Sequence, residues 1–455
     1  MSKKKSLSRR RFLGLVGAAA AGGLLGACAP QTEVVERVVT KEVETEVEVE
    51  KVVTATPGPP TVVEPHKVRL AVGGWAEEST RALFEDGEFT EQTGIDVEIV
   101  LRTDDKETEL TRLASAVQAG TTPYDVIDFE DELTTSFSQA GYMLPLNDLV
   151  SKEVWDDFTP AMRDYSDVWS THEGELFRVI HNWEMPYWFY RKDWFDERGV
   201  EVPETWEDVK PLGEVFTDKD AGVWASVDGL IKGAFLNVYL SWVTLQAGGN
   251  PFDVGPEYEM ALEYIYDLMY TSEVLNPASL QKDYNQQNGD YLADKVAFMR
   301  QWPFFADVAR SEDNADWFSE EKVAVALPPY GPGGPENSTY AAGWGFGIVK
   351  TSPHLEEAKE LLRWLISKET AAKAAQAGFW YLSPRDSVME VVDRDHYLVQ
   401  MLEMYSEADV IGVRPHHPKY VEALGILEDT ASAFLTDQMS LDQSLEQART
   451  QLGAL

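Results

Sequence analysis

Residues 66–129 alternate between strand-like and helix-like patterns, and this order constrains the fold more than any other feature of the chain. Residues 67–72 are typical of a strand, and a helical pattern follows from Thr80 to Gly94, a residue suited to ending a helix. A strand over 96–101, a helix over 107–120 and a short buried strand over 124–129 continue the series. Strand–helix–strand–helix–strand order predicts an open, mainly parallel sheet. In such sheets ligands bind beyond the carboxyl ends of the strands.

The first 28 residues have the pattern of an export signal. Six Lys and Arg residues between positions 3 and 11 precede an apolar run over 12–27, which is too short for a membrane-spanning helix. The run Ser8-Arg9-Arg10-Arg11-Phe12-Leu13 resembles the twin-arginine signature, and a general secretory signal is the alternative. Leu25-Gly26-Ala27-Cys28 resembles a lipobox, in which the cysteine is lipidated. We therefore expect an exported protein that Cys28 anchors to the outer face of the cytoplasmic membrane.

Cys28 is the only cysteine, so no disulfide within the chain is possible and the exported body depends on its core. Residues 29–65 contain no aromatic residue, Leu or Ile, but alternate Val with Glu and end in a Pro-rich stretch. Such a segment cannot build a core. We expect an extended, charged tether rather than a strand or a weak coiled coil, because like charges and prolines keep linkers extended.

The chain carries 78 acidic and 39 basic residues, a formal net charge of −39. Nucleic-acid binding needs a basic surface, so this charge argues against it. It equally argues against broad adsorption to an anionic membrane. The acidic excess is otherwise typical of a soluble exported surface.

A series of short motifs in the body resembles the family 1 bacterial extracellular solute-binding proteins, the maltose-binding-protein-like carbohydrate receptors of ABC importers. The motifs occur in family order over nearly all of residues 66–455, although each one is weak alone. They are Phe89-x-x-x-Thr93-Gly94-Ile95-x-Val97, Ala119-Gly120-x-x-Pro123-x-Asp125-Val126, Gly141-Tyr142-Met143-Leu144-Pro145-Leu146, Tyr190-Arg191-Lys192-Asp193, Pro203-x-Thr205-Trp206, Leu292-Ala293-Asp294-Lys295-Val296-Ala297-Phe298-Met299 and Gly343-Trp344-Gly345-Phe346-Gly347.

This resemblance implies a two-lobed α/β fold of the periplasmic-binding-protein type, with strands that cross a hinge between the lobes. The implied crossings are near 180–183, 337–342 and 381–385. Lobe one would take residues 66–181 and 340–382, and lobe two residues 184–337 and 386–455. The family's lobes close on a ligand in the cleft between them, and a membrane permease recognises the closed form. The implied partners are a small carbohydrate and ABC permease subunits, and we expect a monomer.

Sugars present flat apolar faces and many hydroxyls, so a sugar site needs aromatic rings and planar polar groups. The turns after the first and third strands offer Trp75, Glu77, Glu130 and Asp131. The resemblance places further ligand contacts, and positions of uncertain role complete the candidate set. These residues are Phe129 and Glu132 from the family's sugar-binding turn, Trp183 and Glu184 from its hinge, Trp302 and Trp344 from its stacking positions, and Asn237, Tyr239 and Trp380.

Each aromatic has an alternative role as a core residue, and Glu184 has one as a hinge ion pair. Where the family's maltose binders have further aromatics near the C-terminus, this chain has Ala423 and Leu424, which disfavours a maltodextrin-length site. We predict no cofactor and no metal, because adjacent histidines such as His416 and His417 do not face one ion well.

Alternatives to a sugar receptor remain at this point. A carboxylate-rich cleft suits a polyamine or another cation, Arg300 beside Trp302 suits a uronic acid, and a polyol suits the same fold. A surface glycoside hydrolase is the enzymatic alternative, since it too needs carboxylates near aromatic rings. No serine-nucleophile or zinc motif supports an enzyme, so binding without turnover is our prediction.

Overall fold

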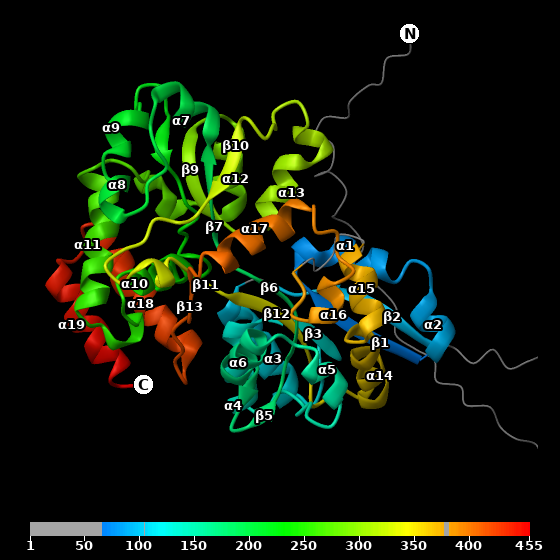
Figure 1. The fold of residues 1–455 in the computed structure, drawn as a ribbon. Coiled ribbons are helices and arrows are strands. Elements are labelled where there is room, and N and C mark those ends of the chain that lie inside the picture. Colours follow the sequence, from blue (N-terminus) through cyan, green and yellow to red (C-terminus); the bar gives the residue numbers. More distant parts are fainter. Residues whose placement is uncertain (1–65, 104, 377–381) are drawn as a thin grey trace, which may run out of the picture. The chain divides into compact units, whose positions relative to one another are not determined.

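The computed structural model describes residues 66–103, 105–376 and 382–455, and Figure 1 shows the arrangement of their helices and strands. The export signal, Cys28 and the tether lie outside the described residues, as does Trp380. Within the described ranges, no helix combines the length and the apolar character needed to cross a bilayer.

Lobe one, as we use the name, is built on a five-stranded sheet with the order β2-β1-β3-β12-β6. β1 pairs in parallel with β2 and β3, and β12 runs antiparallel to β3 and β6. Its strands are β1 (His66–Val72), β2 (Ile95–Leu101), β3 (Val126–Glu130), β6 (Val179–Glu184) and β12 (Ala342–Ile348), with the small pair β4 (Thr171–His172) and β5 (Glu175–Leu176). Its helices are η2 (Gly74–Ala76), α1 (Glu77–Leu83), α2 (Glu88–Thr93), α3 (Lys106–Gln118), η3 (Asp131–Leu133), α4 (Thr134–Gln139), α5 (Lys152–Asp156), α6 (Pro160–Trp169), α14 (Leu355–Leu365), α15 (Lys368–Gln376) and α16 (Asp386–Met389).

The opening β-α-β-α-β order is confirmed, with one change in its first helix. The expected helix over 80–94 is two helices, α1 and α2, because Gly87 adopts a left-handed conformation at φ 72° between them. Gly94 ends α2 with the same φ, and its N–H bonds to the carbonyl of Thr90, as the sequence predicts. Both turns that follow β1 and β3 therefore sit at the carboxyl edge of the sheet.

Lobe two is built on a four-stranded sheet with the order β10-β7-β9-β8, in which only β8 and β9 pair in parallel. The expectation of a mainly parallel sheet in each lobe does not hold here, and in lobe one two of the four strand pairings are antiparallel as well. β7 arrives from β6 of the other sheet, and both of its neighbours, β9 and β10, run antiparallel to it. Its strands are β7 (Tyr187–Arg191), β8 (Trp224–Ser226), β9 (Val296–Gln301) and β10 (Val323–Ala326), with the short pair β11 (Thr339–Tyr340) and β13 (Ile411–Gly412). Its helices are α7 (Lys192–Arg198), α8 (Trp206–Val209), α9 (Leu212–Phe216), α10 (Leu236–Gln246), η4 (Pro251–Asp253), α11 (Pro256–Tyr270), η5 (Pro277–Gln281), α12 (Tyr284–Leu292), α13 (Phe304–Arg310), η6 (Glu312–Asn314), η7 (Pro335–Asn337), α17 (Tyr397–Glu407), α18 (Tyr420–Leu435) and α19 (Leu441–Leu452).

Connections between the two main sheets lie near two of the three expected crossings, the first a few residues after 180–183. β6 of lobe one leads into β7 of lobe two through Met185 and Pro186, and β11 leads into β12 through Ala341. The third differs from the expectation near 381–385. Leu382 packs in a core cluster of lobe two, but the Arg385 Nε donates to Asp157 of lobe one at 2.7 Å. Met389 of α16 also packs against that lobe-two cluster, although α16 contacts α15 of lobe one (Figure 1).

Candidate functional site

A pair of tryptophans, one exposed and one partly buried, lies at the carboxyl edge of the lobe-one sheet. Trp75 lies in η2, directly after β1, and 52% of its surface is exposed. Trp344 of β12 lies opposite Glu130 of β3 in the strand register. The two ring centroids are 4.7 Å apart and the ring planes are tilted by 59°. Because an exposed tryptophan costs apolar burial, this pair is a candidate platform for a ligand.

The Trp344 indole contacts two ionisable side chains. Its Nε1 donates to Glu184 Oε1 at 3.3 Å, and the Arg102 guanidinium lies 4.9 Å from its ring centroid. Burial, and to a smaller degree the charge of Asp131, raise the pKa of the Glu184 carboxyl to about 7, against the lowering effect of the Trp344 hydrogen bond. The structure thus brings Trp75, Trp344 and Glu184 together, and adds Arg102, which the sequence analysis missed.

A second missed cation, Lys106, lies at the start of α3. Its Nζ is 2.9 Å from Glu132 Oε2 and 3.3 Å from Glu130 Oε1. Burial disfavours the ammonium, but the two carboxylates outweigh this effect and raise the pKa of Lys106. The turn after β3 therefore presents its carboxylates as members of an ion network.

The remaining carboxylate of that turn, Asp131, is held by protein groups. Its Oδ1 pairs with the Arg414 guanidinium, and its Oδ2 accepts from the Tyr165 hydroxyl. Burial opposes ionisation of Asp131, but the charge of Arg414 prevails and keeps its pKa below the ordinary value. Arg414 also pairs with Glu132 Oε1 at 3.2 Å. Asp131 thus has partners on both oxygens without a ligand.

Lobe two offers a second aromatic group around Trp302. The Trp302 Nε1 donates to the Tyr284 hydroxyl at 3.2 Å, and Phe235 stacks on the Tyr284 ring at 3.9 Å. The Arg300 Nη2 also donates to that hydroxyl at 3.3 Å, while Arg300 pairs with Asp228 at 2.8 Å. With two donors directed at it, the Tyr284 hydroxyl has its own proton available for an acceptor. The sequence analysis missed Tyr284, although an aromatic residue directly after the N-cap Asp283 is a visible signal.

Other predicted residues occupy places that do not present them to a ligand. Phe129 is fully buried in a lobe-one core cluster, with its ring 5.4 Å from Phe137, so its assignment as a ligand aromatic is corrected. Tyr239 is 6% exposed in a lobe-two core cluster. Its position within α10, buried along its whole length, explains this.

Three further predicted positions, Asn237, Glu77 and Trp183, contact other protein groups. Asn237 is buried, and its side-chain amide donates to Glu428 Oε1 at 3.0 Å. Glu77 forms an i,i+4 ion pair with Arg81 on α1 at 2.9 Å. Trp183 is partly buried between core clusters of both lobes, at the crossing of β6.

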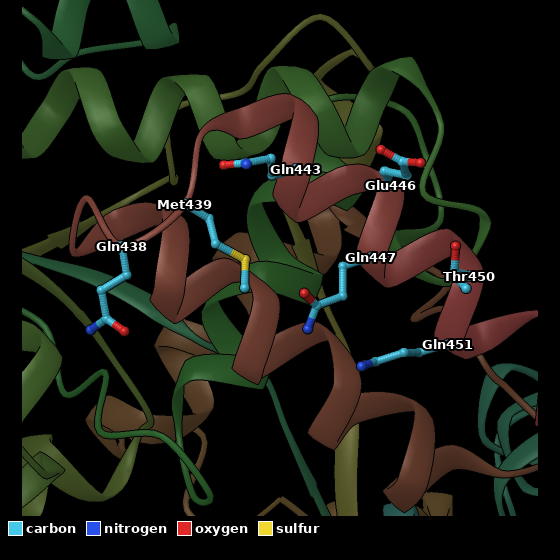
Figure 2. A pocket seen from close by; sticks show the side chains of 7 residues that line it. All are labelled: Gln438, Met439, Gln443, Glu446, Gln447, Thr450 and Gln451. Carbon is cyan, nitrogen blue, oxygen red and sulfur yellow. The ribbon is translucent and has the colours of Figure 1, made fainter.

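Two hollows among the described residues lie elsewhere. A polar hollow of about 580 Å³ runs along α19 and the turn before it, lined by Gln443, Gln447 and Gln451 among others (Figure 2). A cavity of about 40 Å³ lies inside lobe two between Asp228, Arg300 and Tyr239. Neither contains the tryptophan pair of lobe one.

The side chains of His416 and His417 contact different groups. The His416 Nε2 lies 3.0 Å from Thr135 Oγ1, and the His417 Nδ1 accepts from the Lys419 N–H at 3.0 Å. Among the described residues, no group of His, Cys, Asp and Glu has a geometry that would hold a metal ion.

Comparison with known proteins defines the class. Residues 73–372 match the family model of the bacterial extracellular solute-binding protein, and the chain belongs to that family. The match covers every strand of the two main sheets except β1, which ends at Val72, and it includes Trp75, Glu184, Trp302 and Trp344.

Individual relatives are more distant. The osmoprotective compounds-binding protein GgtB of Synechocystis is 28% identical over 137 residues, which span 30% of this chain and 31% of that protein. Maltose-bound MalE3 of T. maritima has a TM-score of 0.71 at 23% identity, over 85% of this chain and 99% of that one. A solute-binding protein of Agrobacterium vitis with bound D-mannitol has a TM-score of 0.67 at 20% identity, over 86% and 98%. The acarbose-binding GacH receptor of Streptomyces glaucescens has a TM-score of 0.69 at 19% identity, over 85% of this chain and 98% of that one. These likenesses show the two-lobed fold.

Proposed function

We propose that this protein captures a neutral sugar or polyol for an ABC importer and binds it without turnover. The observation that carries the proposal is the pair of aromatic groups, Trp75–Trp344 in lobe one and Trp302–Tyr284 in lobe two, each with planar polar groups beside it. Aromatic faces and paired hydrogen-bonding groups match the two surfaces of a sugar. The maltose, D-mannitol and acarbose named for the structural neighbours belong to the same chemical class.

The polar groups support a neutral ligand over an anionic one. Arg300, which would have held a uronic acid, is 2% exposed in its side chain and paired with Asp228. Asn237 Oδ1 is buried without a hydrogen-bond donor, whereas Glu130 Oε1 and Glu132 Oε2 are ion-paired with Lys106. A polyol supplies such donors through its hydroxyls, whereas an anion would add repulsion.

Thermal-shift and calorimetric titration of residues 66–455 with maltose, D-mannitol, ribitol, D-glucuronate and spermidine tests the ligand class. We expect a neutral compound to raise Tm, since a ligand at 100 times its Kd adds about 2.7 kcal/mol of stability. A shift with spermidine alone would establish the polyamine alternative, and a shift with glucuronate alone the uronic acid alternative. Chromatography of the incubated sugars addresses turnover, and the appearance of hydrolysis products would refute a pure receptor.

Anchoring through Cys28 is part of the same proposal, because an importer's receptor acts next to a membrane permease. Cys28 is the only thiol of the chain, so Cys28→Ser removes every site for thioether lipidation. We expect Cys28→Ser to move the protein from the membrane to the soluble exported fraction, as measured by fractionation. Continued membrane association of the variant would contradict lipid anchoring.

A further inference from the structure

Arg414 reaches from lobe two into lobe one at a point beside the hinge. It follows β13, which pairs in parallel with the crossing strand β11. Its guanidinium pairs with Asp131 and Glu132, the first two residues of η3 in lobe one. The side chain of Arg414 is 3% exposed, and those of its partners are 1% and 5% exposed.

Aromatic rings from both lobes enclose the guanidinium. Its carbon lies 4.1 Å from the ring centroid of Trp169, the last residue of α6 in lobe one. On the lobe-two side it lies 5.4 Å from Tyr340 and 5.9 Å from Tyr420. A planar arginine suits such a stacked, two-carboxylate position far better than a lysine.

The two oxygens of Glu132 have different partners. Oε1 pairs with Arg414 at 3.2 Å, whereas Oε2 lies 2.9 Å from the Lys106 Nζ. A carboxylate held on one oxygen keeps its second oxygen in a fixed direction. Arg414 therefore sets the orientation of Glu132, and through it that of Lys106.

Residues that follow these side chains in both segments also contact one another. Thr135 of α4 contacts His416 at 3.0 Å, and the Gln139 side-chain amide donates to the Pro418 carbonyl at 2.9 Å. Two segments, 131–139 and 414–420, thus form one interface with Arg414 at its buried end.

We propose that Arg414 is a positioning residue that pins η3 to lobe two, so that Glu132 and Lys106 face the ligand in a fixed arrangement before it arrives. This inference rests on the proposed function for its ligand. It assigns Arg414 no contact with the ligand, and it makes the lobe-one carboxylate depend on a residue 282 positions later in the chain.

A double-mutant cycle tests whether Arg414 acts through Glu132. We expect Arg414→Gln to weaken the binding of the best ligand among maltose, D-mannitol and ribitol by about tenfold, which corresponds to 1.4 kcal/mol. In a Glu132→Gln background, the same change should weaken binding less than about twofold, because the group it positions is gone. An equal loss in both backgrounds would show a general structural role and overturn the proposal.

Arg191→Gln is the matched control. Arg191 is also buried, pairs with two carboxylates, Asp193 and Asp294, and lies 4.3 Å from a tryptophan ring, that of Trp194. All of these groups belong to lobe two, so the control should lower Tm and leave ligand affinity unchanged. If Arg191→Gln weakened binding as much as Arg414→Gln, the positioning role would be refuted.

Hydrogen exchange of the ligand-free protein separates this inference from the proposed function. We expect Arg414→Gln to speed exchange of the backbone amides over 131–139, while those of α14 keep their native rates. If no compound binds the native protein, the proposed ligand class fails, and the exchange rates alone decide the inference. Unchanged rates over 131–139 would overturn it. Should Arg414→Gln not fold, Arg414→Lys takes its place, since it keeps the charge but loses the paired geometry.

Discussion

The two aromatic groups of the site differ in how firmly the protein holds them. In lobe two, Asp228, Arg300, Tyr284 and Trp302 form a continuous chain of hydrogen bonds that begins at a buried ion pair. In lobe one, Trp75 is 52% exposed and rests against Trp344, which has a single hydrogen bond to Glu184. The comparison indicates a preformed platform in lobe two and an adaptable one in lobe one. Such a division suits a receptor that must hold its ligand first and close afterwards.

The largest expected effect comes from breaking the ion pair that supports the lobe-two platform. Arg300→Met leaves the Asp228 carboxylate buried and unpaired, and losses of about 3–5 kcal/mol are typical of such changes. Urea unfolding should report a loss of this size. Lys282→Met is the control, because the Lys282–Asp290 pair is partly exposed at 22% and 27%, and pairs of this kind contribute about 0–1 kcal/mol. Equal losses of unfolding free energy in the two variants would show that the buried ion pair does not support the lobe-two platform.

The next effect concerns binding through the lobe-two ring. Trp302→Ala should weaken ligand binding by about 2 kcal/mol or more, the size typical of a central aromatic contact, as measured by calorimetry. Trp317→Ala is matched to it, since Trp317 is also partly buried and its Nε1 donates to a single side chain, that of Asp294, at 2.9 Å. The control should bind normally. Native affinity in Trp302→Ala would exclude Trp302 from the site.

The sequence predicted the elements that follow from local patterns. The order of the first five elements and the positions of Trp75, Trp302 and Trp344 depend on short motifs and turns, which a sequence displays directly. Phe129 was misassigned because the family resemblance placed it in the sugar-binding turn, whereas it lies inside β3, which is buried from Val126 to Phe129.

The charged partners of the site could not be predicted in the same way. Arg414 meets Glu132 across 282 positions, and Arg300 meets Asp228 across 72. No local pattern pairs such residues, because the fold alone brings them together. Lys106 and Arg102 flank the start of α3, where a cation is as common on a solvated face as in a site.

A smaller effect is expected for the lobe-one ring. Trp75→Ala should weaken binding by about 0.5–1.5 kcal/mol, the range for one aromatic pair, because Trp344 remains in place. Trp75→Phe keeps an aromatic face and should restore most of the affinity. A larger loss for Trp75→Ala than for Trp302→Ala would reverse the assignment of the firm and the adaptable platform.

The smallest effect concerns Glu184, which links the lobe-one pair to the hinge. Its pKa of about 7 in the folded protein lies above the ordinary value of 4.5. Between these two pH values the folded protein holds a proton that the unfolded chain has released. The stability from this group is therefore complete below pH 4.5 and is lost as the pH rises through 7.

Glu184→Gln cannot ionise, so it should remove this part of the pH dependence. We expect the variant to match the native Tm near pH 4 and to exceed it at pH 8, where the native carboxyl has lost its proton. Glu77→Gln, which alters a carboxylate of the surface helix α1, should show no such divergence between the two pH values. If Glu184→Gln instead lost stability at pH 8, the ionised carboxylate would be a stabilising partner of Trp344. Lobe one would then hold its ring by charge as firmly as lobe two holds Trp302.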